Sequence, residues 1–198
     1  MFSEEKTFYI IAGCNGAGKT TASFTVLPKI LSCKEFVNAD EIAKGISPFN
    51  TDGVALLAGK LMLKRMNGLM TKGETFSVET TLASKLFVET IRKAKEENYL
   101  TVLLFFWLRN IETAKNRVKQ RVKSGGHNID PYVIERRYKS GIKNLFELYV
   151  PVVDMLSIFD NTDNNLECIA EKSGTDEQIQ VINEEKYRML EGYYETIK

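Results

Sequence analysis

Apolar residues along the chain fall into two patterns, short continuous runs and longer stretches with helical spacing. The runs predict five strands, near residues 7–12, 35–38, 75–78, 100–108 and 157–161. Helical spacing covers residues 20–27, 51–72, 84–98, 112–123 and 132–149, and residues 175–198 are expected to form a last helix. This alternation predicts an α/β fold with a mostly parallel five-stranded sheet and helices on both faces.

The same pattern predicts a single domain. No repeat, low-complexity segment or linker interrupts residues 1–198. Residues 100–108 contain almost no polar side chain, which is typical of a central strand that is covered on both faces. A polar break at Gly125 and Gly126 separates two helical stretches, so we expect a lid around residues 117–137. Residues 163–198 are expected to form a helical tail.

Composition narrows the classes of partner and location. The 198 residues are 43% hydrophobic, and 27 basic against 26 acidic side chains give a net charge of +1, which offers no electrostatic argument for a nucleic-acid partner. No apolar run approaches the ~20 residues of a membrane span, and the first residues lack the apolar stretch of a signal peptide. Three widely spaced cysteines fit a reducing compartment, so a cytoplasmic location without membrane contact is expected.

The stretch from Gly13 to Thr20 fits G-x-x-x-x-G-K-[ST], the P-loop or Walker A pattern, and it lies between a predicted strand and a predicted helix. Its glycines let backbone N–H groups approach phosphate oxygens. Lys19 can reach the β- and γ-phosphates, and the Thr20 hydroxyl can hold Mg²⁺. We therefore expect ATP and Mg²⁺ to bind here, on Gly13, Asn15, Gly16, Ala17, Gly18, Lys19, Thr20 and Thr21.

Two interpretations of Cys14, inside this loop, are open. The N–H groups of the loop would stabilise a thiolate, which favours a redox role. Alternatively, Cys14 is a small residue that the loop tolerates.

Asp40 follows the second predicted strand, 21 positions after Lys19. Because ligands of open α/β sheets bind at the carboxyl ends of the strands, a carboxylate here can face the γ-phosphate. It can act as the base toward an acceptor hydroxyl or as a ligand of Mg²⁺ together with Thr20. The alternative is that Asp40 only caps a helix that begins at Glu41.

Glu79, Thr80 and Thr81 follow the third strand, where they can bind a polar substrate, and Glu79 can also hold Mg²⁺ through a water. The alternative is that the threonines, or Ser84, cap the next helix. The fourth strand ends in Trp107, Leu108 and Arg109 without the aspartate of a Walker B motif. A carboxylate in that role must therefore come from Asp40 or Glu79.

Arginines lie on both sides of the polar break. Arg117 and Arg121 are four residues apart and share a helix face, and Arg136 and Arg137 lie beyond the break. Arginine suits the spread negative charge of phosphoryl transfer, so Arg121 and Arg136 are candidate catalytic residues and Arg117 a candidate substrate ligand. The alternative is a solvated basic face.

These segments together resemble the zeta-toxin family of P-loop kinases. The likeness includes the P-loop, Val37 to Ala43, Glu79 to Leu82, Arg117 to His127, Ile134 to Tyr138 and Asp160 to Thr162. It implies that Asp40 is the base, that Lys19 and Thr20 bind phosphate and Mg²⁺, and that Glu79 and Thr80 contact the acceptor. Arg121 matches the first lid arginine. The second is expected near His127, where no arginine stands, so Arg136 or Arg137 takes its place.

The resemblance implies an ATP-dependent kinase whose acceptor is a sugar hydroxyl of a nucleotide sugar such as UDP-N-acetylglucosamine, with an antitoxin protein as a partner. Two alternatives stay open. One is a nucleotide-gated binding module of a toxin-antitoxin system, and the other is a polynucleotide 5′-kinase, against which the near-zero net charge argues.

Overall fold

The strands of the chain form one sheet. The computed structural model describes residues 5–29, 31–126, 128–175 and 177–198, the side chains of 25–29 excepted. Its strands are β1 (Thr7–Gly13), β2 (Glu35–Val37), β3 (Phe76–Thr80), β4 (Leu100–Trp107), β5 (Met155–Asp160), β6 (Glu167–Lys172) and β7 (Gln180–Val181). They pair in the order β2-β3-β1-β4-β5-β6-β7, and the first five are parallel.

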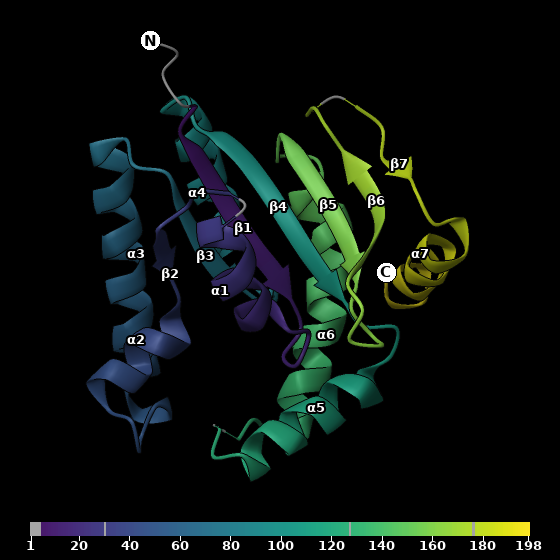
Figure 1. Ribbon diagram of the computed structural model, residues 1–198, viewed down its shortest axis with the longest axis horizontal. Coiled ribbons are helices and arrows are strands. Elements are labelled where there is room, and N and C mark those ends of the chain that lie inside the picture. Colours follow the sequence, from purple (N-terminus) through teal and green to yellow (C-terminus); the bar gives the residue numbers. More distant parts are fainter. Residues whose placement is uncertain (1–4, 30, 127, 176) are drawn as a thin grey trace.

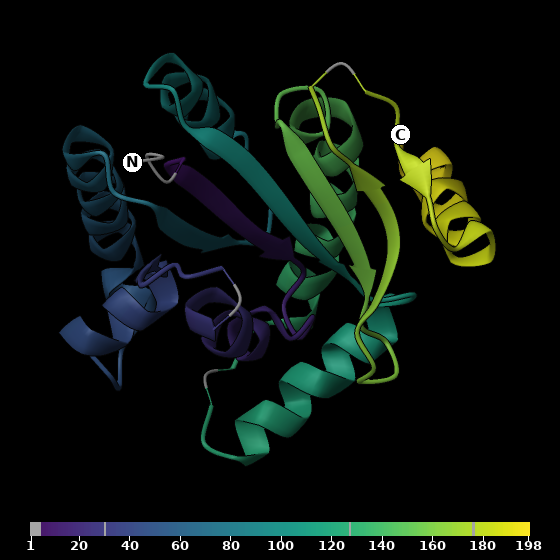
Figure 2. The same ribbon diagram turned by 45° about the horizontal axis from the view of Figure 1, so that its top comes forward.

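Helices cover both faces of this sheet, as predicted. They are α1 (Lys19–Lys29), α2 (Ala39–Ile46), α3 (Ala55–Lys72), α4 (Leu86–Glu96), α5 (Ile111–Lys123), α6 (Pro131–Asn144) and α7 (Glu184–Ile197). In Figures 1 and 2, α4 and α6 lie on one side of the sheet and α1 on the other. A short 3-10 turn, η1 (Asp52–Val54), precedes α3, and a π-helical turn, η2 (Leu145–Tyr149), extends α6.

The predicted parallel strands and the α/β fold class are confirmed, but the strand number and the helical tail are wrong. The sheet has seven strands rather than five because β6 and β7 add antiparallel partners beyond β5. The described part of residues 163–198 therefore contains the strands β6 and β7 before helix α7. β6 carries the charged residues Glu167, Glu171 and Lys172, and β7 has only two residues, so neither has the continuous apolar run by which buried parallel strands are found.

Helix ends follow local chemistry. Gly73 ends α3 in the left-handed conformation at φ 69°, and its N–H donates to Leu69 and Met70, as a glycine after a helix predicts. Asn110 and Asn183 cap α5 and α7 with their side chains. Among the described residues, no helix combines the length and apolar content that crossing a bilayer requires.

The central strands place the candidate site. Residues of β1 and β4 form the middle of the core, and Phe8, Ile10 and Leu103 are fully buried. Ala12 pairs with Thr80 on one side and with Phe105 on the other. The carboxyl ends of β1, β3 and β4 therefore meet at one edge of the sheet, directly beside the P-loop.

Asp154, just before β5, holds the opposite end of the sheet and makes stability depend on pH. Burial alone would raise the pKa of Asp154, but Lys95, Thr101 and Thr175 lower it to about 2 from 3.8. A lowered pKa stabilises the fold above the unfolded value, and this part is lost as pH falls from about 4 to about 2. We expect Asp154→Asn to remove about 2 kcal/mol of this pH-dependent stability. Urea unfolding of the wild-type protein and of the variant between these pH values gives the free energy of unfolding as a function of pH. An equal pH dependence in the two proteins would contradict the prediction.

Candidate active site

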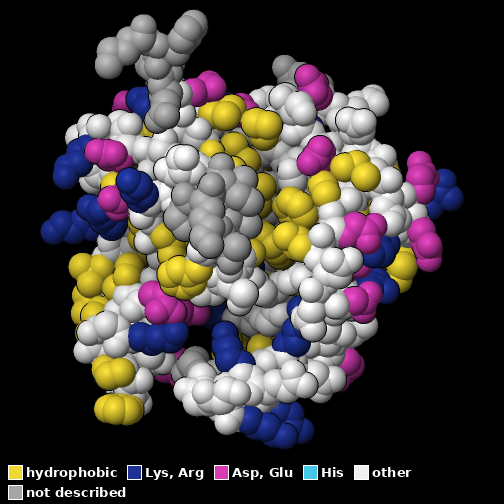
Figure 3. All heavy atoms as spheres, viewed as in Figure 1, with side chains coloured by type: hydrophobic (Ala, Val, Ile, Leu, Met, Phe, Trp, Pro, Cys, Tyr) yellow, Lys and Arg dark blue, Asp and Glu magenta, His cyan; other side chains and the backbone are white. Residues whose placement is uncertain are grey.

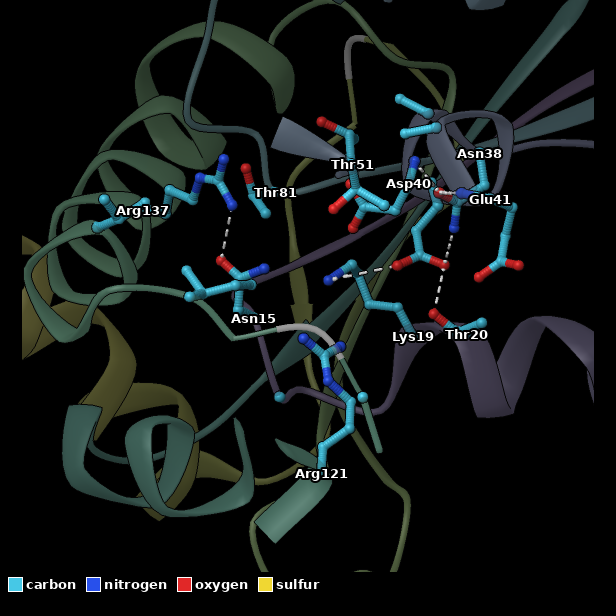
Figure 4. Close-up of a pocket in the computed structure, with 18 of the residues that line it drawn as sticks. Asn15, Lys19, Thr20, Asn38, Asp40, Glu41, Thr51, Thr81, Arg121 and Arg137 are labelled. Atoms are coloured by element: carbon cyan, nitrogen blue, oxygen red, sulfur yellow. Dashed lines mark hydrogen bonds and ion pairs between the residues drawn. The ribbon is translucent and has the colours of Figure 1, made fainter. Parts of the chain in front are cut away.

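A cavity of about 790 Å³ opens at this edge of the sheet. Figure 3 shows a hollow on the face of the molecule, with basic and acidic side chains around it. The cavity is lined from the P-loop, the start of α2, the end of β3, and the facing parts of α5 and α6. Figure 4 shows Lys19, Asp40, Arg121 and Arg137 reaching toward the same space from four elements. The site therefore brings together residues that lie more than a hundred positions apart.

The P-loop is seated on the ends of β4 and β5, and two of its glycines make this seat possible. Gly13 has φ +140°, and a Cβ there would lie 2.2 Å from the Phe106 carbonyl oxygen. Gly18 has φ +86°, and a Cβ there would lie 2.5 Å from Nδ2 of Asn161. That Nδ2 donates to the Ala17 carbonyl oxygen at 2.9 Å. Only glycine allows both approaches without strain.

Lys19 and Thr20, at the start of α1, are both in contact with Glu79 of β3. The Thr20 hydroxyl donates to Oε2 of Glu79 at 2.8 Å, and Lys19 Nζ lies 3.7 Å from Oε1. Lys19 also donates to the Cys14 carbonyl oxygen at 3.0 Å. Of the two carboxylates that the sequence offers for the missing Walker B aspartate, Glu79 is the one in contact with the P-loop hydroxyl.

Asp40 lies in the first turn of α2, exposed at the cavity wall. The interpretation of Asp40 as a helix cap is wrong, because α2 begins at Ala39 and its cap is Asn38, whose Oδ1 accepts from the N–H groups of Asp40 and Glu41. The Asp40 carboxylate is therefore not engaged in capping, and Figure 4 shows it directed into the cavity near Thr51.

Thr80 and Thr81 line the cavity beside Glu79. Their interpretation as helix caps is also wrong, because α4 begins after Lys85, which makes no capping hydrogen bond with its side chain. Instead, the Thr80 hydroxyl accepts from the N–H of Leu82, a buried residue held at φ 54°. Positive φ is costly for leucine, so this loop is fixed by its surroundings.

The cationic wall comes from α5 and α6. Arg121, Arg136 and Arg137 all line the cavity. Arg137 is half-buried, and its guanidinium donates to Oδ1 of Asn15 in the P-loop at 3.3 Å, whereas Arg136 is exposed. Arg137 is therefore the α6 arginine with a contact to the loop. The residue at the family's expected second position, His127, lies outside the described residues.

Arg117 also lines the cavity, but its guanidinium binds the protein itself. It donates to the backbone oxygens of Gly16, Asn161 and Thr162 at 2.7–3.3 Å, and to Oδ1 of Asn164. These contacts join α5 to the P-loop and to the end of β5. Its predicted role as a substrate ligand stays a prediction beside this structural one.

Asp160 at the end of β5 supports the loop from below. It is buried between Arg109 at 3.2 Å and Lys186 of α7 at 3.0 Å. Burial would raise its pKa, but hydrogen bonds from Thr162 and Lys186 and the charge of Arg109 lower it below the ordinary value. Asp160 is followed by Asn161, which holds the P-loop. The last helix and the phosphate-binding loop are thus two steps apart in one network.

The structure favours the interpretation of Cys14 as a small residue that the loop tolerates over a redox role. Its side chain is buried, and burial raises the pKa of the thiol to about 11, against a smaller opposite effect of Lys19. The thiol therefore stays protonated near neutral pH, and a protonated, buried thiol is a poor nucleophile.

A magnesium ion fits the donors of this site. Mg²⁺ in nucleotide sites keeps several waters and takes few protein ligands besides phosphate oxygens. No group of three carboxylate, histidine or cysteine side chains able to hold a metal occurs in the part of the chain that the structure describes. Thr20 would hold the ion directly, and Glu79, bound to the Thr20 hydroxyl, would orient that ligand.

Most predicted site residues are brought together, since all of them but two line the cavity. Gly13 and Ala17 lie beneath it and support the loop. Sequence reasoning missed Asn38, whose signal was its position directly before a helix, and it left Arg137 as an alternative. It also missed the lining residues Lys44, Thr51, Asp52, Asn128 and Asp130, for which no motif exists.

Comparison with known proteins gives one family and a set of structural relatives. The family model described as zeta toxin matches residues 2–190. An uncharacterized protein of Haemophilus influenzae is 28% identical over 138 residues, which are 70% of this chain and 95% of that protein.

Among solved structures, the complex of AvrRxo1-ORF1 with AvrRxo1-ORF2 matches with TM-score 0.76 at 18% identity over 95% of this chain, and the complex has also been solved with ATP. This chain spans 64% of the matched AvrRxo1 chain. The PezAT toxin-antitoxin system of Streptococcus pneumoniae matches with TM-score 0.65 at 15% identity, over 98% of this chain and 88% of that one. At these identities the likeness shows a shared fold.

Proposed function

This chain belongs to the zeta toxin family, and from that premise we propose that it is an ATP-dependent kinase acting on a hydroxyl of a nucleotide sugar such as UDP-N-acetylglucosamine. The observation that carries the proposal is the convergence on one cavity of the P-loop, an exposed aspartate and arginines from two helices. A nucleotide-gated binding module needs only the P-loop, because it transfers no phosphoryl group. The loop and Asp40 share a cavity of about 790 Å³, so ATP and a second substrate side by side in it are part of the proposal.

In the proposed reaction, each polar group has one task. The oxygen of the acceptor hydroxyl attacks the γ-phosphorus, and Asp40 accepts the proton of that hydroxyl. The bond from the γ-phosphorus to the β,γ-bridging oxygen breaks, and ADP leaves. Lys19 and the arginines stabilise the charge on the transferred phosphoryl group. Mg²⁺, when bound, neutralises the charge of the β- and γ-phosphates. Thr80 and Thr81 shape the acceptor side, and Glu79, which lies beside them, also orients the Thr20 hydroxyl.

A screen of acceptors tests the proposal. Phosphorus NMR of the protein with ATP, Mg²⁺ and nucleotide sugars should show a new phosphomonoester signal and an equal amount of ADP. A DNA oligonucleotide with a free 5′-hydroxyl belongs in the same screen, because its labelling would support the polynucleotide kinase instead. ATP hydrolysis without any phosphorylated acceptor would remove the sugar assignment.

Gly141 of α6 packs against the loop that follows β3, residues 81–85, and its replacement tests the acceptor side of the cavity. A Cβ at Gly141 would lie 2.6 Å from the Thr81 backbone oxygen. The loop is also held by Asn144, which donates to the Leu82 oxygen at 2.6 Å. We expect Gly141→Ala to shift Thr81, raise the KM for the acceptor and lower kcat/KM for it about 10-fold or more, because a misplacement of about 1 Å can lower a catalysed rate about 10²-fold. ATP affinity should stay unchanged.

Gly192→Ala is the matched control, because that glycine also lies inside a helix and a Cβ there meets nothing within 4 Å. Steady-state kinetics with each substrate varied in turn separates the two KM values. Equal loss of affinity for ATP and acceptor in Gly141→Ala would mean that the change disturbs the whole site instead.

A protein partner is the second part of the proposal. The structural relatives include a toxin-antitoxin system and a two-protein complex, which supports an antitoxin-like partner, and we propose that this partner covers the cavity. Affinity purification from the native cell should recover one partner in stoichiometric amount, and its release should accompany Mg²⁺-ATP binding. Recovery of the chain alone would count against this part and leave the kinase proposal standing.

A further inference from the structure

The side chain of Asn38 is placed between two functional segments. It is 7% exposed. Its Oδ1 accepts from the backbone N–H groups of Asp40 at 2.8 Å and Glu41 at 3.3 Å, which fixes the start of α2. Its Nδ2 donates to Oε2 of Glu79 at 2.9 Å, on the neighbouring strand β3. One amide therefore connects the helix that carries Asp40 with the carboxylate beside the P-loop (Figure 4).

The oxygen that Asn38 reaches is the one that also holds Thr20. Oε2 of Glu79 accepts from the Thr20 hydroxyl at 2.8 Å. A hydroxyl has one hydrogen and two lone pairs, so a threonine that donates to Glu79 keeps its lone pairs for a cation. The direction of those lone pairs depends on where Glu79 is held, and Asn38 is one of the groups that hold it.

From these contacts we propose that Asn38 is a positioning residue that orients Glu79, and through it the magnesium-binding hydroxyl of Thr20, in fixed relation to Asp40. The inference rests on the proposed kinase function. A single side chain would then fix both the metal-binding end of the site, at Thr20, and the base end, at Asp40. Partners that orient metal ligands in this way are commonly worth 10–100-fold in metal affinity or activity.

The residue type supports a role beyond helix capping. Serine, threonine and aspartate cap helices about as well as asparagine does. None of them keeps the cap and also donates to Glu79, because serine and threonine are too short to reach both groups and aspartate has no N–H. Asn38→Ser therefore keeps the cap and removes only the hydrogen bond to Glu79.

The chain contains a matched control. Asn183 caps α7 with its Oδ1, and its Nδ2 donates to Oε1 of Glu167 at 2.6 Å. This is the same double use of one asparagine, but at a helix that does not line the cavity. Asn183→Ser thus removes an equivalent hydrogen bond between a cap and a carboxylate without touching the proposed metal site.

The experiment measures how strongly Mg²⁺ couples to nucleotide binding. Isothermal titration with a non-hydrolysable ATP analogue is done once in Mg²⁺ and once in EDTA. For each protein, the affinity in Mg²⁺ divided by the affinity in EDTA gives an affinity ratio. We expect Asn38→Ser to lower this ratio about 10-fold or more, with the affinity in EDTA unchanged, whereas Asn183→Ser keeps the wild-type ratio. Asn38→Asp, which places a second carboxylate beside Glu79, should lower it further. Thermal unfolding checks that each variant folds.

Three results would overturn the proposal. The first is a wild-type ratio in Asn38→Ser, and the second is an equal loss in Asn183→Ser. The third is a further, additive loss when Asn38→Ser is combined with Glu79→Gln, because a residue that acts through Glu79 has no effect once Glu79 is changed. Wild-type protein that does not bind the analogue at all would reject the kinase function itself, which is a distinguishable outcome.

Discussion

Asp40→Asn is expected to lower the rate of phosphoryl transfer about 10²–10⁴-fold while ATP still binds with wild-type affinity. The range is what a positioned general base contributes. Asparagine has nearly the shape of aspartate and can stay in the first turn of α2, whose cap is supplied by Asn38. The loss would therefore come from the missing proton acceptor and not from a displaced helix. Single-turnover kinetics with saturating ATP and acceptor measures the chemical step directly.

Glu41→Gln is the control for this variant. Glu41 is the next residue, is exposed, lines the same cavity and pairs with Lys44 at 2.6 Å. Its replacement changes the local charge by the same amount and should cost little, as exposed ion pairs do. Equal losses in both variants would mean that the negative potential of this helix end, and not a base at Asp40, matters. Full activity in Asp40→Asn would remove Asp40 as the base.

Arg137→Ala is expected to lower kcat about 10²–10³-fold, more than Arg136→Ala does. A charged donor aimed at a developing phosphoryl charge has an effect of this size. Arg137 is half-buried and contacts Asn15 of the P-loop, whereas Arg136, which the sequence analysis favoured, is exposed at the rim. The two arginines are adjacent on α6, so each variant is the other's control for charge and helix stability.

Arg137→Lys adds a second measurement. Lysine keeps the charge but loses the planar fork that can bind a phosphoryl oxygen and Asn15 together. We expect it to recover only part of the lost rate. A larger loss in Arg136→Ala than in Arg137→Ala would reverse the assignment and restore the original prediction for the second lid arginine.

The parallel sheet and the P-loop could be predicted from sequence because each has a strong local signal. The apolar run from Leu100 to Trp107 is stable only as a strand that is buried between two layers of helices. The stretch from Gly13 to Thr20 is a continuous motif. β6 and β7 have no such signal, because an antiparallel strand such as β6 tolerates charges such as Glu171 and β7 is only two residues long.

The candidate site divides in the same way. Asp40 and Glu79 were found because strand ends converge on ligands in this fold class. The choice between Arg136 and Arg137 depends on which face of α6 packs on Asn15, and the role of Asn38 depends on a hydrogen bond to a strand 41 positions away. Such long-range contacts leave no pattern in a single sequence.

The buried pairing of Asp160 with Arg109 and Lys186 bears on how the protein can be shortened. The motif segments of the sequence end at Thr162, so a chain cut after that residue would keep every motif, although the family model matches residues 2–190. Such a truncation would remove Lys186 and leave Asp160 with Arg109 as its ion-pair partner, and losing one partner of a buried charge is destabilising. Because Asn161 carries this disturbance to the Ala17 oxygen, the minimal nucleotide-binding unit extends into α7. Any fusion, tag or crystallisation fragment should keep that helix.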